Sequence, residues 1–190
     1  NVLLNLIQKL DNTFNSIKIF TQDAAEPLYE YLASKIEKPF LEIFEGIDAW
    51  NNYPIEDMED NNQVLFIFDD FVVESLKKQQ KICEMYIRAR KMNRSGISLM
   101  YLTQSFYQTP IIIRRQATEL ILKKINGQRE LRAILKDCSL EAESKQLEGM
   151  YDYCVQSSDD IQNFLLIQKT APESERFRKN LKTVLNPNDF

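Results

Sequence analysis

Val64-Leu65-Phe66-Ile67-Phe68-Asp69-Asp70 is the stretch that most strongly restricts the fold of this 190-residue chain. Its five apolar residues follow one another without alternation, which is typical of a strand buried on both faces of a sheet. The two carboxylates after them are costly to bury unless they serve a cation or a proton. The stretch therefore predicts an inner strand with Asp69 and Asp70 at its exit. A turn after a strand also favours Asp, and the stretch alone leaves both interpretations open.

A second buried strand is predicted one helix further along the chain. Residues 76–92 have helical spacing, and Ile97–Leu102 is again apolar, with Gln104 shortly after it. In an open parallel sheet, ligands bind beyond the carboxyl ends of the strands. Asp69, Asp70 and Gln104 are therefore expected at one edge, where Gln104 can donate to a phosphate oxygen or orient a water. A surface glutamine at a strand end is the alternative.

Strand and helix patterns alternate along the whole sequence. The periodicity predicts further helices at residues 2–10, 26–36, 129–136 and 143–153, a charged tail helix at 173–185, and strands at 16–20, 40–44, 120–122 and 164–167. The polar, acidic residues 48–62 predict a loop or a short helix. This alternation predicts βαβ crossovers and a largely parallel sheet. We expect one α/β domain over residues 1–190.

Composition excludes several classes of function. The chain has no histidine, which rules out Ser-His-Asp, Cys-His and His-ligated metal chemistry. Its three cysteines, Cys83, Cys138 and Cys154, lie far apart without a CxxC pair, which favours buried thiols in a reducing compartment. No stretch approaches the roughly 18 consecutive apolar residues of a membrane span, so no membrane partner is predicted.

The charge is distributed unevenly. Residues 77–136 carry 14 Lys or Arg against three acidic residues, a balance of +11, whereas the rest of the chain holds 10 basic and 25 acidic residues. Only this middle segment is suited to contact phosphates. The alternative is that its basic helix faces are simply solvated.

Several blocks of the sequence resemble one group of known proteins, in the same order along the chain. They are FNSIKIFTQDAAEPLYEYLASKI (residues 14–36), FIFDD (66–70), YIRARKMNRSGISLMYLTQSF (86–106), QSFYQTPIIIRRQ (104–116) and ERFRKN (175–180). The run over residues 86–106 resembles the FtsK–HerA superfamily of ring-shaped DNA pumps. Together the blocks are more similar to its genome-packaging ATPases of large double-stranded DNA viruses and their smaller relatives, including virophages and Polinton-like elements.

This resemblance implies a RecA-like P-loop NTPase fold, an α/β three-layer sandwich with a mainly parallel sheet, and it implies ATP and Mg²⁺ as cofactors. It matches Asp69 to the Mg²⁺-associated Walker B acid, Asp70 to the catalytic carboxylate and Gln104 to the sensor residue after the next strand. Asp70 departs from the Glu that is common in the wider superfamily, although the viral branch tolerates Asp.

The phosphate-binding loop of the superfamily does not occur in the sequence, because no GxxxxGK[ST] is present. The resemblance places that loop, and the strand before it, directly upstream of Asn1. The helix pattern at 2–10 also begins without an N-cap, which suggests a start further upstream. We therefore expect a strand and GxxxxGK[ST] just before Asn1, and we expect these 190 residues alone neither to bind ATP well nor to hydrolyse it.

The resemblance also implies an arginine that completes the site of the neighbouring subunit in a ring. Arg88, Arg90, Arg114, Arg115 and Arg129 are available. On a helix, Arg88 and Arg90 point about 160° apart and cannot both face one site. Arg129, just before a predicted helix, matches an arginine at a comparable place in the superfamily. Arg129 or Arg90 is the predicted arginine, with a surface salt bridge as the alternative for each.

The function implied by the resemblance is ATP-driven translocation of viral double-stranded DNA into a preformed capsid by a homo-oligomeric ring. The implied partners are duplex DNA of any sequence and capsid or portal-vertex proteins. The implied location is the site of virion assembly in the host cytoplasm or nucleus, or the virion itself. Three alternatives stay open: a cellular or plasmid FtsK/HerA-like pump, a non-catalytic DNA-binding or assembly module of the same fold, and a metal-dependent nuclease using Asp69 and Asp70. The nuclease lacks a convincing third acid with a nearby Lys.

Overall fold

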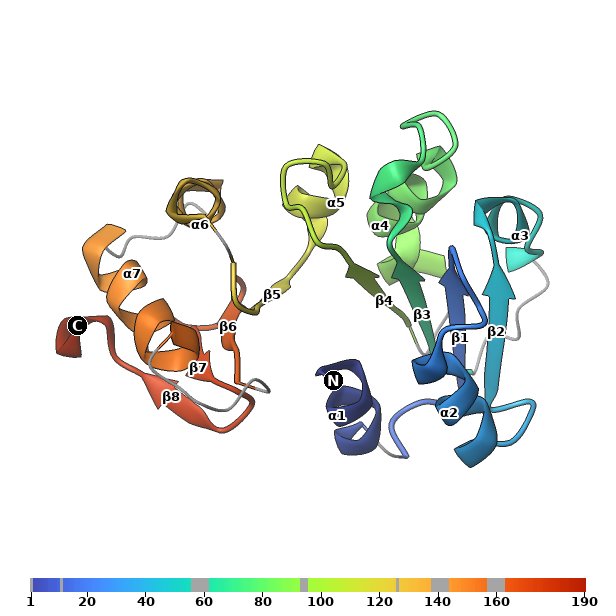
Figure 1. Ribbon diagram of the computed structural model, residues 1–190, viewed down its shortest axis with the longest axis horizontal. Coiled ribbons are helices and arrows are strands. Elements are labelled where there is room, and N and C mark those ends of the chain that lie inside the picture. The colour runs from blue at the N-terminus through green and yellow to red at the C-terminus, as the bar shows by residue number, and fades with distance from the viewer. Residues whose placement is uncertain are drawn as a thin grey trace. The chain divides into compact units, whose positions relative to one another are not determined.

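The structure is a computed structural model that describes residues 2–10, 12–55, 62–92, 96–125, 127–137, 144–156 and 163–190. The chain divides into two compact units, Asn1–Gln116 and Ala117–Phe190. Figure 1 labels the helices and strands of both units. The expected single ATPase core over residues 1–190 stays a prediction.

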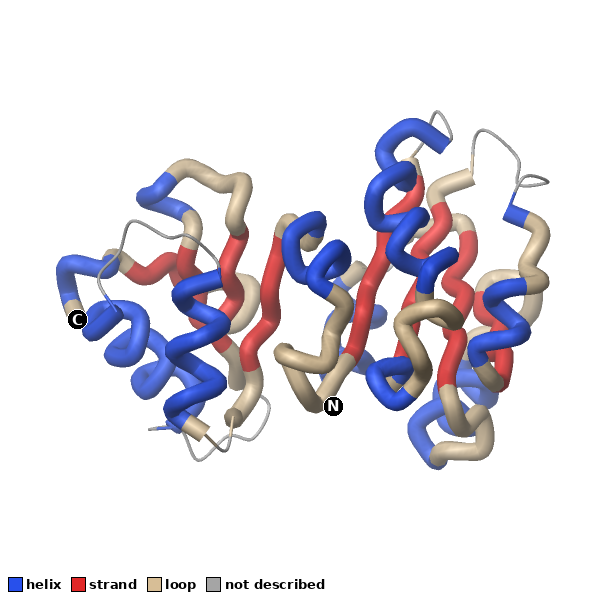
Figure 2. Tube along the Cα trace, turned by 90° about the horizontal axis from the view of Figure 1, so that it is seen from above, coloured by secondary structure: helices blue, strands red, loops and turns tan. Residues whose placement is uncertain are grey.

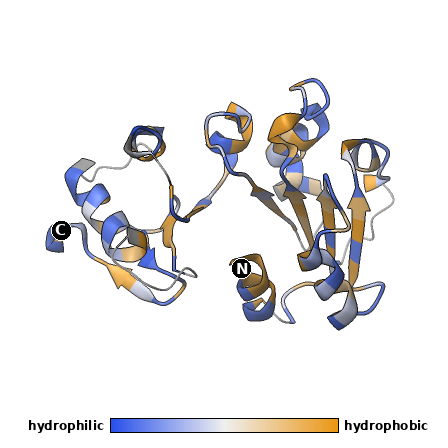
Figure 3. Cartoon of the chain, viewed as in Figure 1, coloured by the Kyte–Doolittle hydropathy of each residue, from blue (hydrophilic) through white to orange (hydrophobic). Residues whose placement is uncertain are grey.

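The first unit is built on a four-stranded parallel sheet with the strand order β2-β1-β3-β4. The strands are β1 (Ser16–Thr21), β2 (Leu41–Glu45), β3 (Val64–Asp69) and β4 (Ile97–Leu102), each within one residue of its predicted bounds. Their side chains are mainly hydrophobic, as Figure 3 shows by colour. The parallel sheet expected from the alternating pattern is therefore confirmed in this unit.

Helices cover both faces of this sheet. One face packs against α1 (Val2–Lys9) and α2 (Pro27–Lys35), and the other against α3 (Ile47–Asn51), α4 (Gln80–Met92) and α5 (Ile111–Gln116). The tube view in Figure 2 shows the strands between helices. This arrangement is the predicted three-layer sandwich. Sequence patterns missed α5, and α4 begins four residues later than its pattern suggested.

An aromatic core fixes β3 from one side. Phe66 and Phe68 are fully buried there with Trp50 of α3, at ring-centroid distances of 5.4 and 4.7 Å from the indole. Ile67 points to the opposite face and packs in the core that α1 and α2 form. Side chains of β3 are thus buried on both faces, as the unbroken apolar run predicts. The strand end at Asp69 is correspondingly well positioned.

The strand β4 differs from its prediction. Its apolar sequence predicts burial on both faces, but most of its side chains are only partly buried. Among the residues that the structure describes, β4 pairs with β3 alone and lies at the edge of the sheet. An edge strand has one row of unpaired backbone groups, so its outer side can accept a further strand.

The second unit contains a separate four-stranded sheet with the order β5-β6-β7-β8. Its strands are β5 (Glu119–Leu122), β6 (Leu165–Gln168), β7 (Phe177–Lys179) and β8 (Thr183–Leu185), all paired antiparallel, and its helices are α6 (Gln128–Asp137) and α7 (Ser144–Tyr151). The largely parallel sheet predicted for the whole chain is therefore correct for the first unit only. No described helix is long and apolar enough to cross a membrane.

The predicted tail helix at residues 173–185 is wrong. A 3₁₀ turn at Glu173–Glu175 leads instead into a hairpin of β7 and β8. Asn180 adopts a positive φ of 57°, a conformation that Asn tolerates better than most residues. The backbone amide of Asn180 donates to the carbonyl of Phe164, and the side-chain oxygen of Asn180 accepts from the amide of Phe164. These bonds, and burial of Phe177 opposite Leu185, outweigh the helical charge pattern.

The predicted burial of the thiols holds for Cys83 and Cys154, which are free and buried. The third cysteine, Cys138, lies outside the described residues.

Candidate active site

The acid pair lies where β3 leaves the sheet. Asp69 is the last residue of β3 and stands in register with Thr21 of β1 and Leu102 of β4. The amide of Asp70 donates to the carbonyl of Leu102 at 3.2 Å, and Asp70 then turns the chain in the left-handed region, with φ 58° and ψ 31°. Asp is one of the few residues that occupy this region readily. The predicted position of both acids is therefore confirmed.

Tyr29 of α2 is the direct partner of Asp69. The phenol is fully buried, and its hydroxyl donates a hydrogen bond to Oδ2 of Asp69. Burial raises the pKa of Tyr29, and the bond to Asp69 raises it further, so the hydroxyl stays protonated and remains a donor at neutral pH. Burial also raises the pKa of Asp69; the hydrogen bond from Tyr29 opposes that rise, and the charge of Asp70 adds to it.

Thr21 completes this buried polar group. It is 1% exposed at the end of β1, and its hydroxyl oxygen accepts from the amide of Asp23 at 3.3 Å. Thr21 stands in register with Asp69 on the neighbouring strand, and its hydroxyl lowers the pKa of Asp69 and of Tyr29. Sequence analysis missed both hydroxyls. A polar residue closing an apolar strand is a usable signal for Thr21, but no local pattern links Tyr29 to an acid 40 residues away.

A second polar group supports the segment after Asp70. Tyr101 of β4 donates to the side-chain oxygen of Gln79 at 2.8 Å, and Gln79, 1% exposed, donates to the carbonyl of Glu74 at 2.8 Å. Burial raises the pKa of Tyr101, and the charges of Cys83 and Asp70 add to the rise. These bonds join the chain that follows the acid pair to the neighbouring strand.

Gln104 lies at the same edge of the sheet as the acids. It lies two residues after Leu102, and the carbonyl of Leu102 accepts a hydrogen bond from the amide of Asp70. Its side chain is exposed, in a turn where the hydroxyl of Thr103 accepts from the amide of Ser105 at 3.1 Å. The topology therefore brings the three predicted residues to one edge, and the role of Gln104 stays a prediction.

The two candidate arginines are placed less completely. Arg129 is exposed near the start of α6 in the second unit. Arg90 belongs to α4 in the first unit, but its side chain lies outside the described part of the structure. Of the other candidates, Arg114 donates to the carbonyl of Thr109 at 3.1 Å within its own unit. The choice between Arg129 and Arg90 stays a prediction.

The donor set at the acid pair suits Mg²⁺ bound with a nucleotide. Mg²⁺ in phosphoryl-transfer sites is held by one or two carboxylates, waters and substrate phosphates, not by a complete protein cage. Asp69 and Asp70 supply two carboxylates at one strand end. Within the described ranges, no group of three or more His, Cys, Asp or Glu side chains is arranged to hold a metal.

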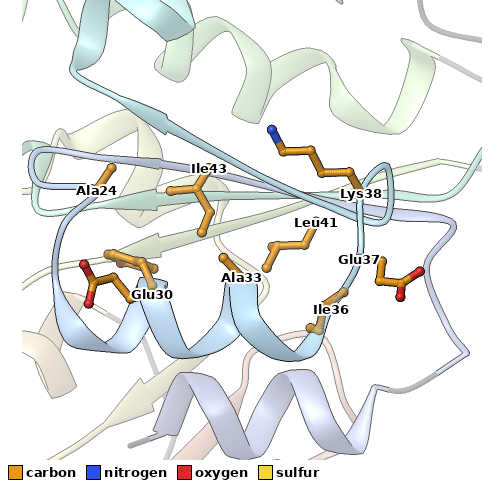
Figure 4. Close-up of a pocket in the computed structure, with 9 residues that line it drawn as sticks. Ala24, Glu30, Ala33, Ile36, Glu37, Lys38, Leu41 and Ile43 are labelled. Atoms are coloured by element: carbon orange, nitrogen blue, oxygen red, sulfur yellow. The ribbon is translucent and has the colours of Figure 1, made fainter.

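A pocket beside α2 is separate from these acids. It measures about 450 Å³, lies between α2 and β2, and is lined mainly by apolar side chains such as Ala33 and Leu41, as Figure 4 shows. Neither Asp69 nor Asp70 lines it, although the ring of Tyr29 does. A largely apolar wall does not suit a triphosphate. The candidate active site is therefore at the strand ends.

Replacing Asp69 by Asn is expected to stabilise the first unit. The raised pKa of Asp69 means that the folded state binds a proton more tightly than the unfolded state. The Asp69 carboxylate therefore lowers the stability of the folded state fully at pH values above the raised pKa. This loss of stability is absent below the ordinary carboxyl pKa of about 4. At pH 7 without Mg²⁺, Asp69→Asn should raise the free energy of unfolding by ~1 kcal/mol, because buried functional charges often lower stability.

Urea unfolding followed by the fluorescence of Trp50, the one tryptophan and a core residue of this unit, measures the effect. The gain should shrink towards pH 4. A wild-type chain that is more stable than the variant at pH 7 would contradict the expectation.

The parallel sheet between two helical layers, with acids at the exit of an inner strand, defines a P-loop NTPase-like α/β fold. No protein-family model matches the chain, and no curated protein matches it. Solved structures that share its fold include those of the genome packaging NTPase B204 from Sulfolobus turreted icosahedral virus 2. The complex with ATP-gammaS has a TM-score of 0.57 at 17% identity, over 95% of this chain and 88% of that chain.

Two further structures are similar to the same extent. The AMPPCP complex of the same B204 has a TM-score of 0.60 at 16% identity, over 94% of this chain and 88% of that chain. B204, the DNA-packaging ATPase from Sulfolobus Turreted Icosahedral Virus, has a TM-score of 0.60 at 17% identity, over 92% and 86%. The predicted fold class is thereby confirmed.

Proposed function

We propose that the chain is the larger part of an ATP-driven motor that moves viral double-stranded DNA into a capsid. The observation that carries the proposal is the pair Asp69–Asp70 at the exit of β3, within a fold shared with packaging NTPases. Two of the B204 structures named above are complexes with ATP-gammaS and with AMPPCP, which supports ATP as the nucleotide. The sequence blocks that resemble viral packaging ATPases support the same function.

The side chains at this edge suit the steps of phosphoryl transfer. Asp69, held by Tyr29, would hold Mg²⁺, which when bound neutralises charge on the phosphates. Asp70 would orient the attacking water and accept its proton, and Gln104 would donate to a γ-phosphate oxygen or orient the same water. The proposal also needs a phosphate-binding loop, which these 190 residues do not contain. ATP hydrolysis is therefore assigned to the full-length protein.

The proposed assembly is a homo-oligomeric ring in which Arg129 or Arg90 reaches the site of the next subunit. Duplex DNA would be bound without regard to sequence, through the basic segment 77–136. Capsid or portal-vertex proteins are the proposed docking partners. The proposed location is the site of virion assembly in the host cytoplasm or nucleus, or the virion.

Displacement of a third strand from duplex DNA tests the motor directly. The full-length protein is expected to hydrolyse ATP faster when duplex DNA is added, and to displace a triplex-forming oligonucleotide from duplexes of unrelated sequence only while ATP is hydrolysed. Omitting Mg²⁺ should abolish both activities. Hydrolysis without displacement would exclude a motor, and DNA binding without hydrolysis would favour the non-catalytic module. If the protein displaces the third strand but the DNA does not become protected inside empty capsids, the result would favour a cellular or plasmid pump.

A further inference from the structure

Asp69 reaches the strand end with a buried hydroxyl already bonded to it. Tyr29 comes from the sheet-facing side of α2 and is fully buried, and its hydroxyl donates a hydrogen bond to Oδ2 of Asp69. A buried phenol must have a hydrogen-bond partner, and here that partner is a carboxylate of the proposed active site. Bonds to an ionised acceptor are about twice as strong as bonds between neutral groups.

The phenol is held by a rigid framework. The ring of Tyr29 packs in a core cluster with Ile19 of β1 and Ile67 of β3, and α2 is entered through Pro27 at its first position. Pro at this place sets the helix start. Thr21, in register with Asp69 across β1 and β3, adds a second buried hydroxyl to the same group. Helix, strand and acid therefore cannot move independently.

We propose that Tyr29 is a positioning residue that holds the side chain of Asp69, with Thr21 as a weaker second support, in the orientation that Mg²⁺ association requires. The inference rests on the proposed function, because it takes Asp69 as the Mg²⁺-associated acid. A hydrogen bond from a buried, well-packed donor restricts the rotation of a carboxylate. Residues that orient metal-associated side chains in this way commonly change metal affinity by 10- to 100-fold when they are replaced.

The same helix supplies a matched control. Tyr31 lies two residues from Tyr29 but is 52% exposed, so Tyr31→Phe removes an identical hydroxyl from the surface. Binding of Mn²⁺ to the full-length protein with AMPPCP, counted as loss of the free Mn²⁺ signal in electron paramagnetic resonance, reports metal affinity without turnover. Binding of AMPPCP in excess EDTA reports the nucleotide alone, and circular dichroism reports folding.

Tyr29→Phe is expected to weaken Mn²⁺ binding by ~10-fold and Thr21→Val by less, in the same direction. The affinity for AMPPCP without metal should stay within about twofold of wild type. A loss of folded protein would lower both affinities, so it would not produce a change in Mn²⁺ binding alone. Tyr31→Phe should change neither measurement. A folded Tyr29→Phe protein with wild-type Mn²⁺ affinity overturns the proposal. If Tyr29→Phe does not fold, unchanged Mn²⁺ affinity in Thr21→Val overturns it instead.

Asp69→Ala separates this inference from the proposed function. If Asp69→Ala weakens Mn²⁺ binding but Tyr29→Phe does not, the positioning role fails and the function of Asp69 stands. If Asp69→Ala leaves Mn²⁺ binding unchanged, the assignment of Asp69 fails, and the positioning role fails with it.

Discussion

Asp70→Asn in the full-length protein is expected to bind Mg²⁺-ATP almost normally and to hydrolyse it at least ~10²-fold more slowly, because the amide cannot accept the proton of the attacking water. Asn suits this test because Asp70 occupies the left-handed region at φ 58°, which Asn also tolerates. Ala would add backbone strain to the loss of the carboxylate. Single-turnover hydrolysis and equilibrium binding of ATP measure the two effects separately. Wild-type turnover in Asp70→Asn would refute its catalytic role.

Two companion variants sharpen this result. Asp69→Ala should weaken Mg²⁺-ATP binding itself, since it removes the acid assigned to the metal. Gln104→Ala should leave binding intact and lower turnover less than Asp70→Asn does, because Gln104 is exposed and supplies a donor but no proton acceptor. Equal losses of turnover in all three variants would instead indicate a common structural defect.

The Asp70→Asn chain also tests the arginine from the neighbouring subunit. Arg129→Ala and Asp70→Asn rings should each be inactive, but mixed rings should recover some activity, because an intact Arg129 can then meet an intact Asp70 across an interface. Arg90→Ala is the paired comparison. Recovery with Arg90→Ala and not with Arg129→Ala would reverse the ranking of the two arginines.

The position of the acid pair could be predicted from sequence because it depends on a local pattern. Five unbroken apolar residues before Asp69 have one stable placement, an inner strand, and β3 is buried at each of them. The left-handed turn at Asp70 could not be predicted this way. The positive φ offers a physical reason why residue 70 is Asp and not the Glu that is common in the wider superfamily, because short Asp and Asn side chains accept positive φ better than longer ones.

Contacts between distant segments account for what sequence analysis missed. Tyr29 was part of a predicted helix, but its bond to Asp69 depends on how α2 packs over the sheet. The tail was misassigned for a related reason. Its charges suit an exposed helix, whereas pairing of β7 with β6 and the turn at Asn180 are non-local and decide the structure. Propensity is a weak guide where tertiary pairing competes with it.

Binding of duplex DNA should fall steeply with salt, but less steeply than a local charge of +11 suggests. Contacts to phosphates release counterions and lower log affinity by about 0.9 per decade of salt for each contact. Several cations of segment 77–136 already have partners. Lys78 pairs with Glu74 at 3.0 Å and Arg132 with Glu148 at 2.8 Å, whereas the ammonium of Lys81 donates to three backbone carbonyls.

Other cations of this segment are exposed on both units, among them Arg88, Lys91 and Lys124. With about three phosphate contacts per subunit, affinity should fall by ~40-fold between 50 and 200 mM salt. Fluorescence anisotropy with unrelated duplexes measures the slope. Lys123→Gln with Lys124→Gln should reduce it equally for every duplex, because phosphate contacts carry no sequence information.

Lys35→Gln with Lys38→Gln is the matched control for this slope. It removes the same charge from an exposed part of the first unit, outside segment 77–136, where acidic residues predominate in the sequence. The duplex should contact few phosphates there, so the slope should keep its wild-type value. An equal change in both double variants would show that net charge, and not a basic surface, controls binding. A preferred base sequence, or affinity that is constant over this range of salt, would exclude segment 77–136 as the surface of a sequence-independent motor.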